Sequence, residues 1–382
     1  MLLPVPASVP HVPGILTAQD VRDTGASIVA VQESDGAIPW SRADRTDTWN
    51  HVEAAMALVV TGHLTAARQA YEWCANTQRE DGSWPMRVVL GEVDDSSGET
   101  NMSAYLAVGV WHHWLVLRDR RFVDRMWPHV RAGLDFVVGL QEPAGGIAWS
   151  VDPQGRTNHD MLLTASSSIH QSLGAGLALA ALVDEPQPHW ELALGRLGHA
   201  LREHPEEFKD LSHFAMDWYY PVLGGAVRGE PARALLLGER WDRFVTAGRG
   251  IRCVLPNEWW TGAETCELVM SLHAVGEVDR ARQLLADMQH LRHRLGGYWT
   301  GYVADDTIWP RQQTTFTAAA VVLAADQLSG TTPGSDIMIG RTLVTAAPEI
   351  GLGCGCPDDP DVRDRTADWP RHARAARAST PR

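Results

Sequence analysis

Apolar residues recur at spacings of three and four along most of this 382-residue chain, which is the period of an amphipathic helix. The pattern predicts about twelve helices, most of them in successive pairs. We expect them over residues 19–33, 49–61, 64–76, 101–118, 122–141, 161–182, 190–203, 211–227, 231–247, 263–275, 278–295 and 314–327.

The predicted helices are of two kinds. One kind is apolar nearly all round and rich in small residues, as in 173–181 and 318–325, so it must be covered on every side. The other kind has a charged face, as in 277–288. An inner ring of small-residue helices inside an amphipathic outer ring satisfies both patterns. The sequence therefore predicts an all-α fold, an (α/α)6 barrel or toroid, because the alternative of an open helical solenoid would need atypical capping repeats.

A short pattern of Gln, three residues, Gly and then Trp recurs where predicted helices end. It occurs at Gln32–Trp40, Gln78–Trp84 and Gln141–Trp149, with a degenerate copy that has His293 in the Gln place and is followed by Gly297. Residues 53–69 also match 267–283 at one constant offset. Such repetition indicates that one helix-pair unit is used several times.

Composition limits the domain organisation and the partners. Residues 1–330 carry the helical pattern and are predicted to form a single barrel domain, whereas 331–382 turn to Gly, Pro, Thr and Asp and then to Arg and Ala, which predicts an irregular or disordered extension. The net charge of −14 argues against nucleic acid and anionic membrane surfaces as partners. No basic residue precedes an apolar run at the start and no apolar run is long enough to cross a membrane, so we expect a cytoplasmic protein.

Cysteine and histidine spacing gives no strong metal signature. The five cysteines are odd in number and irregularly spaced, which argues against a disulfide framework. Cys354-Gly-Cys356 lacks the second Cys or His pair of a zinc site. We therefore expect neither a metal nor a cofactor.

Polar and aromatic residues concentrate in the segments that lead into the predicted inner helices. In a closed barrel these segments converge on one mouth. They span residues 44–51, 97–101, 164–170, 217–220, 258–264 and 305–313. Some of their Asp, Ser and Thr residues are expected to act as helix caps, but caps do not explain the many aromatic and amide side chains.

Tryptophan is over-represented, with 16 Trp against 6 Tyr and 6 Phe. A flat indole with a polar N–H suits stacking on the C–H face of a sugar. The repeat residues Trp84 and Trp149 are expected to pack between helix layers instead. Ligand contact is expected for Trp49, Trp218, Trp259, Trp260 and Trp309.

Hydrolysis of a glycosidic bond needs two carboxyl groups, one protonated and one ionised. The candidates at the predicted mouth are Asp47, Glu99, Asp217, Glu258, Glu264, Asp305 and Asp306. Glu53 and Glu267 occupy equivalent repeat positions, which indicates a shared structural hydrogen bond.

Two of these carboxylates stand outside the repeat. Asp47 aligns with Thr261, and Glu264 aligns with Asn50, as expected of a site added to a symmetric scaffold. The sequence therefore predicts Asp47 and Glu264 as the catalytic pair, facing each other across the barrel, with Glu267 or Glu258 as the alternative to Glu264.

Two resemblances follow from these segments. Gln-x-x-x-Gly-x-Trp at 78–84 resembles the repeat of squalene cyclases, whose acidic Asp-x-Asp-Asp motif survives here only as the fragment Asp305-Asp306. That resemblance implies shared architecture. The segments 44–51 and 258–264 resemble a group of actinobacterial proteins labelled prenyltransferase-like, over residues 17–330. The group includes an α-endomannosidase that trims mycobacterial methylmannose polysaccharide.

The second resemblance implies an inverting hydrolase that cuts inside chains of α-(1→4)-linked, partly methylated mannose, so the expected partner is an oligo- or polysaccharide. It places one catalytic carboxylate at Asp47, with Glu264 the nearest match for the other. We assign Glu264 as general acid and Asp47 as general base, an order that could be reversed, with carboxyl groups on the order of 6.5–9.5 Å apart. Substrate contacts are expected from Trp49, Asn50, His51, Glu99, Asn101, His170, Asp217, Trp218, Tyr219, Trp259, Trp260, Glu267, Trp309, Gln312 and Gln313.

Two other functions remain open at this point. One is a terpene cyclase or prenyltransferase-like enzyme, although the chain has few of the Phe and Tyr residues that shield carbocations. The other is a non-catalytic barrel that binds a glycan or lipid, which predicts an aromatic groove without two facing carboxylates.

Overall fold

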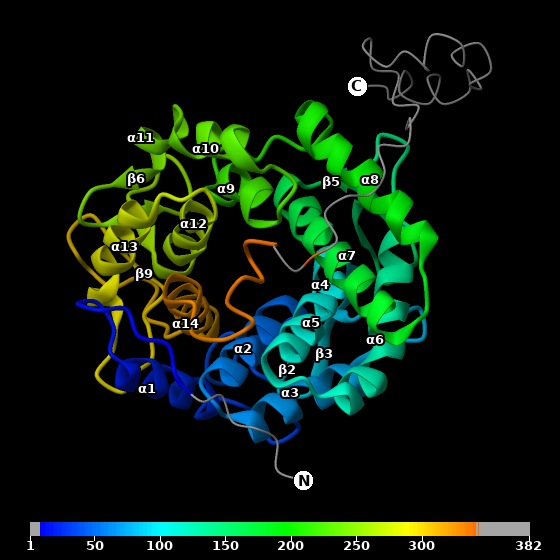
Figure 1. Ribbon diagram of the computed structural model, residues 1–382, viewed down its shortest axis with the longest axis horizontal. Coiled ribbons are helices and arrows are strands. Elements are labelled where there is room, and N and C mark those ends of the chain that lie inside the picture. The colour runs from blue at the N-terminus through cyan, green and yellow to red at the C-terminus, as the bar shows by residue number, and fades with distance from the viewer. Residues whose placement is uncertain (1–7, 341–342, 344–382) are drawn as a thin grey trace.

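Helices make up most of the computed structural model, which describes residues 8–340 and 343 (Figure 1). Six helices form a closed inner ring in which each packs against the next and the last packs against the first. In ring order they are α2 (Thr48–Val60), α5 (Leu106–Leu117), α7 (Leu163–Val183), α9 (Met216–Leu223), α12 (Gly262–Ala274) and α14 (Thr315–Ser329). A short helix, α4 (Thr100–Ala104), leads into α5.

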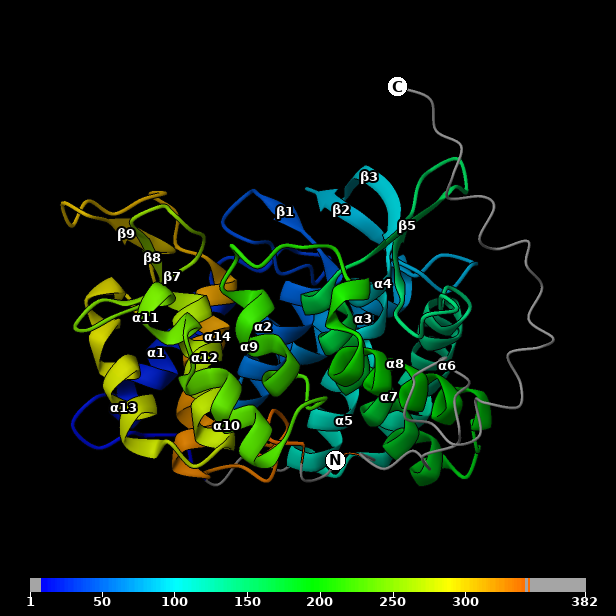
Figure 2. The ribbon, with the colours of Figure 1, turned by 90° about the horizontal axis from the view of Figure 1, so that it is seen from above.

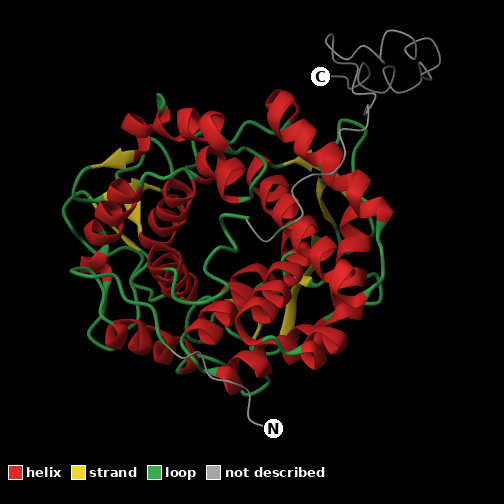
Figure 3. Ribbon diagram, in the orientation of Figure 1, coloured by secondary structure: helices red, strands yellow, loops and turns green. Residues whose placement is uncertain are grey.

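An outer layer of helices covers this ring (Figure 3). It consists of α1 (Ala18–Val29), α3 (Leu64–Thr77), α6 (Arg120–Val138), α8 (Pro188–Glu203), α10 (Gly229–Leu237), α11 (Arg240–Phe244) and α13 (Val278–Asp287). The two predicted kinds of helix correspond to the two layers. In α6 the buried side chains Phe122, Met126, Val130 and Leu134 follow one stripe, whereas α14 is buried on nearly every side.

Short strands, which the sequence did not predict, gather on the face where the inner helices begin (Figure 2). One antiparallel sheet has the order β1 (Arg45–Thr46), β2 (Pro85–Val89), β3 (Glu92–Glu99), β4 (Ala148–Val151) and β5 (Thr157–Met161). The other contains β6 (Val245–Thr246), β7 (Gly250–Arg252), β8 (Trp259–Thr261) and β9 (Gly301–Val303). The all-α prediction is thus corrected to a mainly helical fold. Strands of only two to eight residues give too little alternation to be read from sequence.

Two helical predictions also differ from the structure. The predicted helix over 101–118 is divided between α4 and α5, which meet at Tyr105. The predicted helices over 211–227 and 231–247 shrink to α9, α10 and α11, and Gly225, which has positive φ, prevents the first of them from continuing beyond α9. Two single 3-10 turns, Pro205–Glu207 and Gln289–Leu291, follow α8 and α13.

The Gln repeat joins the loop after one outer helix to the next outer helix along the chain. The Gln amide donates both to the carbonyl of its own Gly and to a carbonyl of the following outer helix, at distances between 2.9 and 3.0 Å. The Gly of each copy has positive φ and lies against that same helix. The bonds join Gln32 to Ala66, Gln78 to His129, and Gln141 to Ala193.

The fourth copy of this repeat begins one residue earlier than the sequence predicted. Arg292 takes the Gln place, with its guanidinium 3.5 Å from the carbonyl of Asp20 in α1. Gly296, not Gly297, has the positive φ of 91°, and its backbone lies against the Asp23 carbonyl. Because α1 is the first outer helix, this copy joins the last helix pair to the first and closes the outer layer.

The chain after α14 returns into the ring at the end opposite the strands (Figure 1, Figure 2). Asp326 accepts hydrogen bonds from the amide and hydroxyl of Thr332, and Gln171 in α7 donates to the carbonyl of Ile337 at 3.2 Å. Ile337, Met338 and Ile339 are buried. The first part of the predicted extension, 332–340, therefore packs as part of the ring; the rest of it, with Cys354 and Cys356, lies outside the described residues.

Candidate active site

Acidic side chains stand at the start of several inner helices, on the face that carries the strands. Asp47 is the N-cap of α2 and Glu99 is the N-cap of α4. Asp217 and Glu264 lie in the first turns of α9 and α12. The N-terminus of a helix favours the ionised form of a carboxyl group, whereas burial favours its neutral form.

The repeat register predicted for α2 and α12 is reproduced at their N-termini. Asp47 and Thr261 are the two N-caps, so Asn50 matches Glu264 three residues into each helix. The ring order, however, corrects the expected placement. The two helices flank α14 and do not face each other across the barrel. Their inward side chains therefore converge from two nearby positions of the ring and not from opposite walls.

An aromatic floor closes the ring beneath this face. The ring of Trp49 in α2 lies 6.0 Å from that of Tyr105 and 5.7 Å, edge-on, from that of Tyr220 in α9. Since α2 and α9 occupy opposite positions in the ring, these contacts span its interior. Trp49 was predicted to contact ligand, and it is half-buried at the top of this floor.

Two buried carboxyl groups lie within the floor. Glu53 accepts a hydrogen bond from Tyr105 at 2.9 Å, and Glu267 accepts from both Tyr219 and Tyr220, the latter at 2.7 Å. Burial raises the pKa of both Glu53 and Glu267, and their mutual repulsion raises the pKa of Glu267 further. Tyrosine hydroxyls donate to both carboxyl oxygens of Glu267. Glu267 and Tyr219, which were predicted to contact substrate, therefore lie below the candidate site and support it.

Asp47 and Glu99 form an acidic pair above the floor. Asp47 is 3% exposed and accepts hydrogen bonds from the Asn50 amide (2.9 Å) and side chain (2.7 Å). Burial raises the pKa of Asp47, and the Asn50 bonds oppose that rise. Burial likewise raises the pKa of Glu99 to about 7, with a further contribution from the nearby charge of Asp47. Glu99 therefore keeps a proton more readily than an ordinary glutamate, whereas the Asn50 bonds favour the ionised form of Asp47.

Glu264 is the second predicted catalytic residue and is only partly buried. Its Oε1 lies 3.4 Å from Sγ of Cys253, in the loop between β7 and β8. The charge of Glu264 also raises the pKa of Glu267, which follows it by three residues on the same helix face. Glu264 thus belongs to the same electrostatic cluster as Glu53 and Glu267. Glu258, the predicted alternative, is exposed and 3.8 Å from Arg252.

Exposed aromatic residues rim the second sheet. Trp259 donates to the carbonyl of Trp309 at 2.9 Å, the two rings meet edge-to-face at 5.1 Å, and Trp309 is 53% exposed. Trp260, by contrast, is buried on Tyr302 beneath the guanidinium of Arg249. The predicted ligand contact is therefore kept for Trp259 and Trp309, while Trp260 supports the rim.

Trp149, which sequence reasoning assigned to helix packing, lies beside Glu99. Burial raises the pKa of Glu99, and hydrogen bonds from the amides of Met102 and Asn101 and from the Trp149 side chain act to lower it. Its membership in the Gln repeat concealed this position. Trp84, in the equivalent repeat, does pack between layers, being 1% exposed and bonded to the carbonyl of Cys74.

Four predicted substrate contacts point into the protein. Both ring nitrogens of His51 are used, by the Ile38 amide and the Ala70 carbonyl. The indole of Trp218 donates to Leu235 and stacks on Phe244. These side chains lie between the two helix layers, as does His170, which is bonded to the Gly224 carbonyl. Gln313 is partly buried in the loop before α14, with its side-chain oxygen beside Gly297.

The remaining predicted contacts lie near the inner helix starts. Asn50 holds Asp47, and Gln312 donates to Asp44 at 3.3 Å. Asp217 accepts from the Thr164 hydroxyl at 2.6 Å. Asn101 is 1% exposed, and its side-chain oxygen has no hydrogen-bond partner within the described part of the chain.

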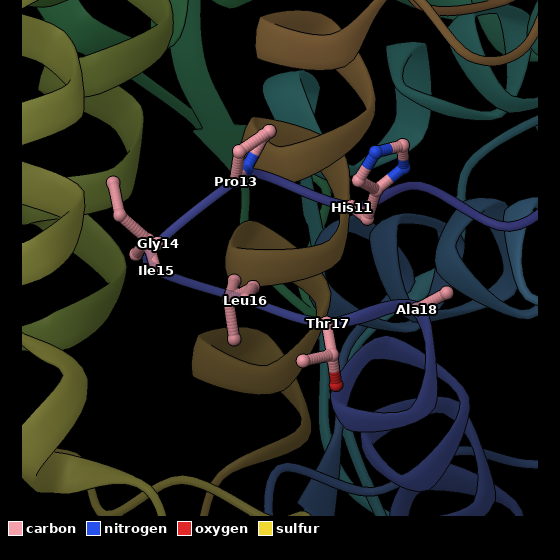
Figure 4. A pocket seen from close by; sticks show the side chains of 7 residues that line it. All are labelled: His11, Pro13, Gly14, Ile15, Leu16, Thr17 and Ala18. Carbon is pink, nitrogen blue, oxygen red and sulfur yellow. The ribbon is translucent and has the colours of Figure 1, made fainter.

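Other parts of the described chain offer no comparable chemistry. A shallow pocket of about 450 Å³ is lined by His11, Pro13, Gly14, Ile15, Leu16, Thr17 and Ala18 (Figure 4). It contains no carboxyl group. The cyclase-like fragment is equally unsuited, since Asp305 and Asp306 are exposed and Asp306 pairs with Arg249 at 3.0 Å.

Residues 8–340 and 343 contain no group of three or more His, Cys, Asp and Glu side chains that could hold a metal ion. Within the same residues, no helix has the length and apolar character required to cross a membrane.

Comparisons with known proteins place this arrangement in a family. No family model matches the chain. The solved structure of a wild-type glycosidase superposes with a TM-score of 0.63, covering 82% of this chain and 97% of its own at 14% identity. A GH63 mannosylglycerate hydrolase from Thermus thermophilus gives a TM-score of 0.62, with 80% and 99% coverage and 14% identity. A D-mannose isomerase gives 0.62 at 10% identity, with 82% and 96% coverage.

At these identities the structural likenesses establish only the fold. A sequence relative goes further. The MMP endo-(1,4)-3-O-methyl-alpha-D-mannosidase of Mycolicibacterium hassiacum is 52% identical over 350 residues, which cover 91% of this chain and 97% of that protein. This chain therefore belongs to the family of the MMP endo-(1,4)-3-O-methyl-alpha-D-mannosidase, a glycoside hydrolase family.

Proposed function

We propose that this protein is an endo-acting α-mannosidase that cleaves α-(1→4)-linked, 3-O-methylated mannose polysaccharide into oligosaccharides. The observation that carries the proposal is the 52% identity to a mannosidase of that specificity, spread over 97% of its length. We infer that the two helical layers are an (α/α)6 barrel and that this one domain, including residues 332–340, carries the activity.

The proposed reaction uses Glu264 as general acid and Asp47 as general base. Glu264 gives its proton to the glycosidic oxygen as the bond from that oxygen to the anomeric carbon breaks. A water molecule attacks the anomeric carbon from the other side and loses a proton to Asp47. The product anomer is then inverted, which requires carboxyl groups roughly 6.5–9.5 Å apart, with room for the water.

The ring geometry supports such a separation. Helices in contact lie about 9 Å apart, so the axes of α2 and α12, two places apart around a six-membered ring, are separated by roughly 16 Å. Side chains of Asp47 and Glu264 directed at the interior would shorten that gap to the range of an inverting pair. A retaining enzyme would need the carboxyl groups at about 5 Å.

Asp47 is suited to the role of base because its orientation is fixed. Two hydrogen bonds from Asn50 hold both of its oxygens and favour the ionised form. Glu99 lies beside it, and with a pKa raised to about 7 it can hold a proton for a sugar hydroxyl or ring substituent. We therefore propose Glu99, Asn101 and Trp149 as sugar contacts next to Asp47.

The aromatic rim fits a methylated sugar. Trp259 and Trp309 present indole rings at the end of β8 and in the loop after β9. An indole face packs well against C–H groups and methyl ethers, whereas it offers little to a fully hydroxylated, strongly hydrated face. We propose this pair as a subsite for the 3-O-methyl groups.

The test is the hydrolysis of methylmannose oligosaccharides by the wild type and by Asp47→Asn and Glu264→Gln, with products resolved by anomer in an NMR time course. Glu258→Gln is the matched control, because Glu258 precedes the same helix but is exposed. We expect an inverted product, loss of at least about a thousandfold in kcat for the first two variants with retained oligosaccharide binding, and near-normal activity for the control.

Three outcomes would contradict the proposal. A product with the anomeric configuration retained would exclude the inverting mechanism. Full activity in either catalytic variant would exclude that residue. Failure of the wild type to cleave any methylated or unmethylated α-(1→4)-mannan would exclude the proposed substrate class.

A further inference from the structure

Cys253 is the side chain in hydrogen-bond contact with the proposed general acid. Its Sγ lies 3.4 Å from Oε1 of Glu264, within the range for a thiol donor and an oxygen acceptor. Two backbone bonds fix its position: its amide donates to the carbonyl of Trp259 at 3.1 Å, and its carbonyl accepts from the amide of Ala215 at 2.9 Å. The thiol is thus tied to both β8 and the start of α9.

The thiol has the protonation state that a donor requires. Burial and the charge of Glu264 raise the pKa of Cys253 far above its ordinary range, so the sulfur keeps its hydrogen. A neutral thiol is a weak hydrogen-bond donor, and the Glu264 carboxyl oxygen lies within its reach. The acceptor is specifically Oε1, which leaves Oε2 as the other oxygen of the carboxyl group.

We propose that Cys253 is a positioning residue that fixes which oxygen of Glu264 carries the catalytic proton; this inference rests on the proposed function. The thiol hydrogen occupies Oε1, so the acidic proton resides on Oε2 and is directed at the glycosidic oxygen. When that proton moves to the leaving oxygen, the electron pair of the broken bond stays on that oxygen. The thiol keeps its own hydrogen and stabilises the carboxylate left on Glu264.

The role predicts a dependence on the leaving group. A sugar leaving group needs protonation, whereas 2,4-dinitrophenolate leaves without it. Cys253→Ala removes the donor, and a weak hydrogen bond of this type corresponds to about a five- to tenfold loss in kcat on methylmannose oligosaccharides, with KM within about twofold. On the 2,4-dinitrophenyl glycoside of the same oligosaccharide the loss should fall below about twofold.

Cys253→Ser and Cys266→Ala complete the experiment. The serine hydroxyl restores a donor at the same position and should recover most of the lost kcat. Cys266 is a fully buried thiol two residues after Glu264 on α12, so its alanine variant controls for the loss of a buried sulfur.

The outcomes distinguish this inference from the proposed function. Suppose that Glu264→Gln regains kcat on the dinitrophenyl substrate, whereas Cys253→Ala loses the same factor of kcat on both substrates. Cys253 is then merely structural, and the inference is wrong. If Glu264→Gln shows no recovery on that substrate, Glu264 is not the general acid, and the proposed function fails first. Should Cys253→Ala not fold, Cys253→Val takes its place as a variant without a donor, and equal losses on both substrates would overturn the inference.

Discussion

Glu99→Gln tests whether the site holds a carboxyl group at the expense of stability. Glu99 is 4% exposed, and its pKa rises from 4.5 to about 7 on folding. At 1.36 kcal/mol per pH unit this rise corresponds to roughly 3 kcal/mol. Because the folded-state pKa is raised, the protonated carboxyl group stabilises the fold fully below pH 4.5. That contribution is lost as the pH rises toward 7.

Gln is neutral at every pH and can still accept the Met102 amide that Glu99 caps. We therefore expect Glu99→Gln and the wild type to have similar free energies of unfolding at about pH 4.5, and the variant to be more stable by about 3 kcal/mol at about pH 8. For a folded part of this size that difference is about 4 °C in Tm.

Urea titrations at about pH 4.5, 6, 7 and 8 measure the difference directly, with the substitution of an exposed glutamate, Glu258→Gln, as a control. If the difference between Glu99→Gln and the wild type is the same at every pH, the carboxyl group ionises as easily in the folded protein as in the unfolded chain. The description of the acidic pair would then be wrong. A loss of activity together with the gain in stability would identify Glu99 as retained for function.

Three further predictions follow from the structure. Gly82→Ala should lower the free energy of unfolding, measured in urea, by about 3 kcal/mol or more, because φ is 91° and the new Cβ would lie 2.2 Å from the Ala132 carbonyl oxygen. Gly91→Ala, which has open space around it, should lower that free energy less, and equal losses in the two variants would contradict the repeat contact. Tyr220→Phe should lower the free energy of unfolding by about 1.5–3 kcal/mol by removing a bond to a buried carboxyl group, and a loss below about 0.5 kcal/mol would exclude that bond. Trp309→Ala should raise KM for methylated oligosaccharides about fivefold with kcat and Tm nearly unchanged; an unaltered KM would remove Trp309 from the rim subsite.

The layered helical fold could be predicted because its signals are local. Apolar residues all round a helix require cover on every side, as in α14, and a single apolar stripe as in α6 indicates an outer helix. The strands could not be predicted, since segments of two to eight residues that pair only through tertiary contacts leave no pattern of their own. The offset of the fourth repeat was missed because Arg292 replaces Gln while making a bond to the same kind of carbonyl.

The positions of the candidate site residues along the helices could be predicted, but the directions in which their side chains point could not. Asp47, Glu99 and Glu264 were expected at the starts of inner helices, and they lie there. Sequence alone does not say which way a side chain points within a helix buried on every side, so His51 and Trp218, which face the outer layer, were assigned to the mouth. Trp149 and Cys253 lie in segments whose course depends on strand pairing, and no motif marks their part in the site.

The sealed lower end of the ring determines how a polymer can approach. Residues 332–340 fill the side opposite the strands, and the rings of Trp49, Tyr105 and Tyr220 meet across the interior. A sugar chain cannot be threaded through this toroid, so it must drape over the open face with both ends free in solvent. Neither terminus needs to be recognised for cutting to occur, and a macrocyclic oligosaccharide, which has no terminus, would fit the same surface as a linear one.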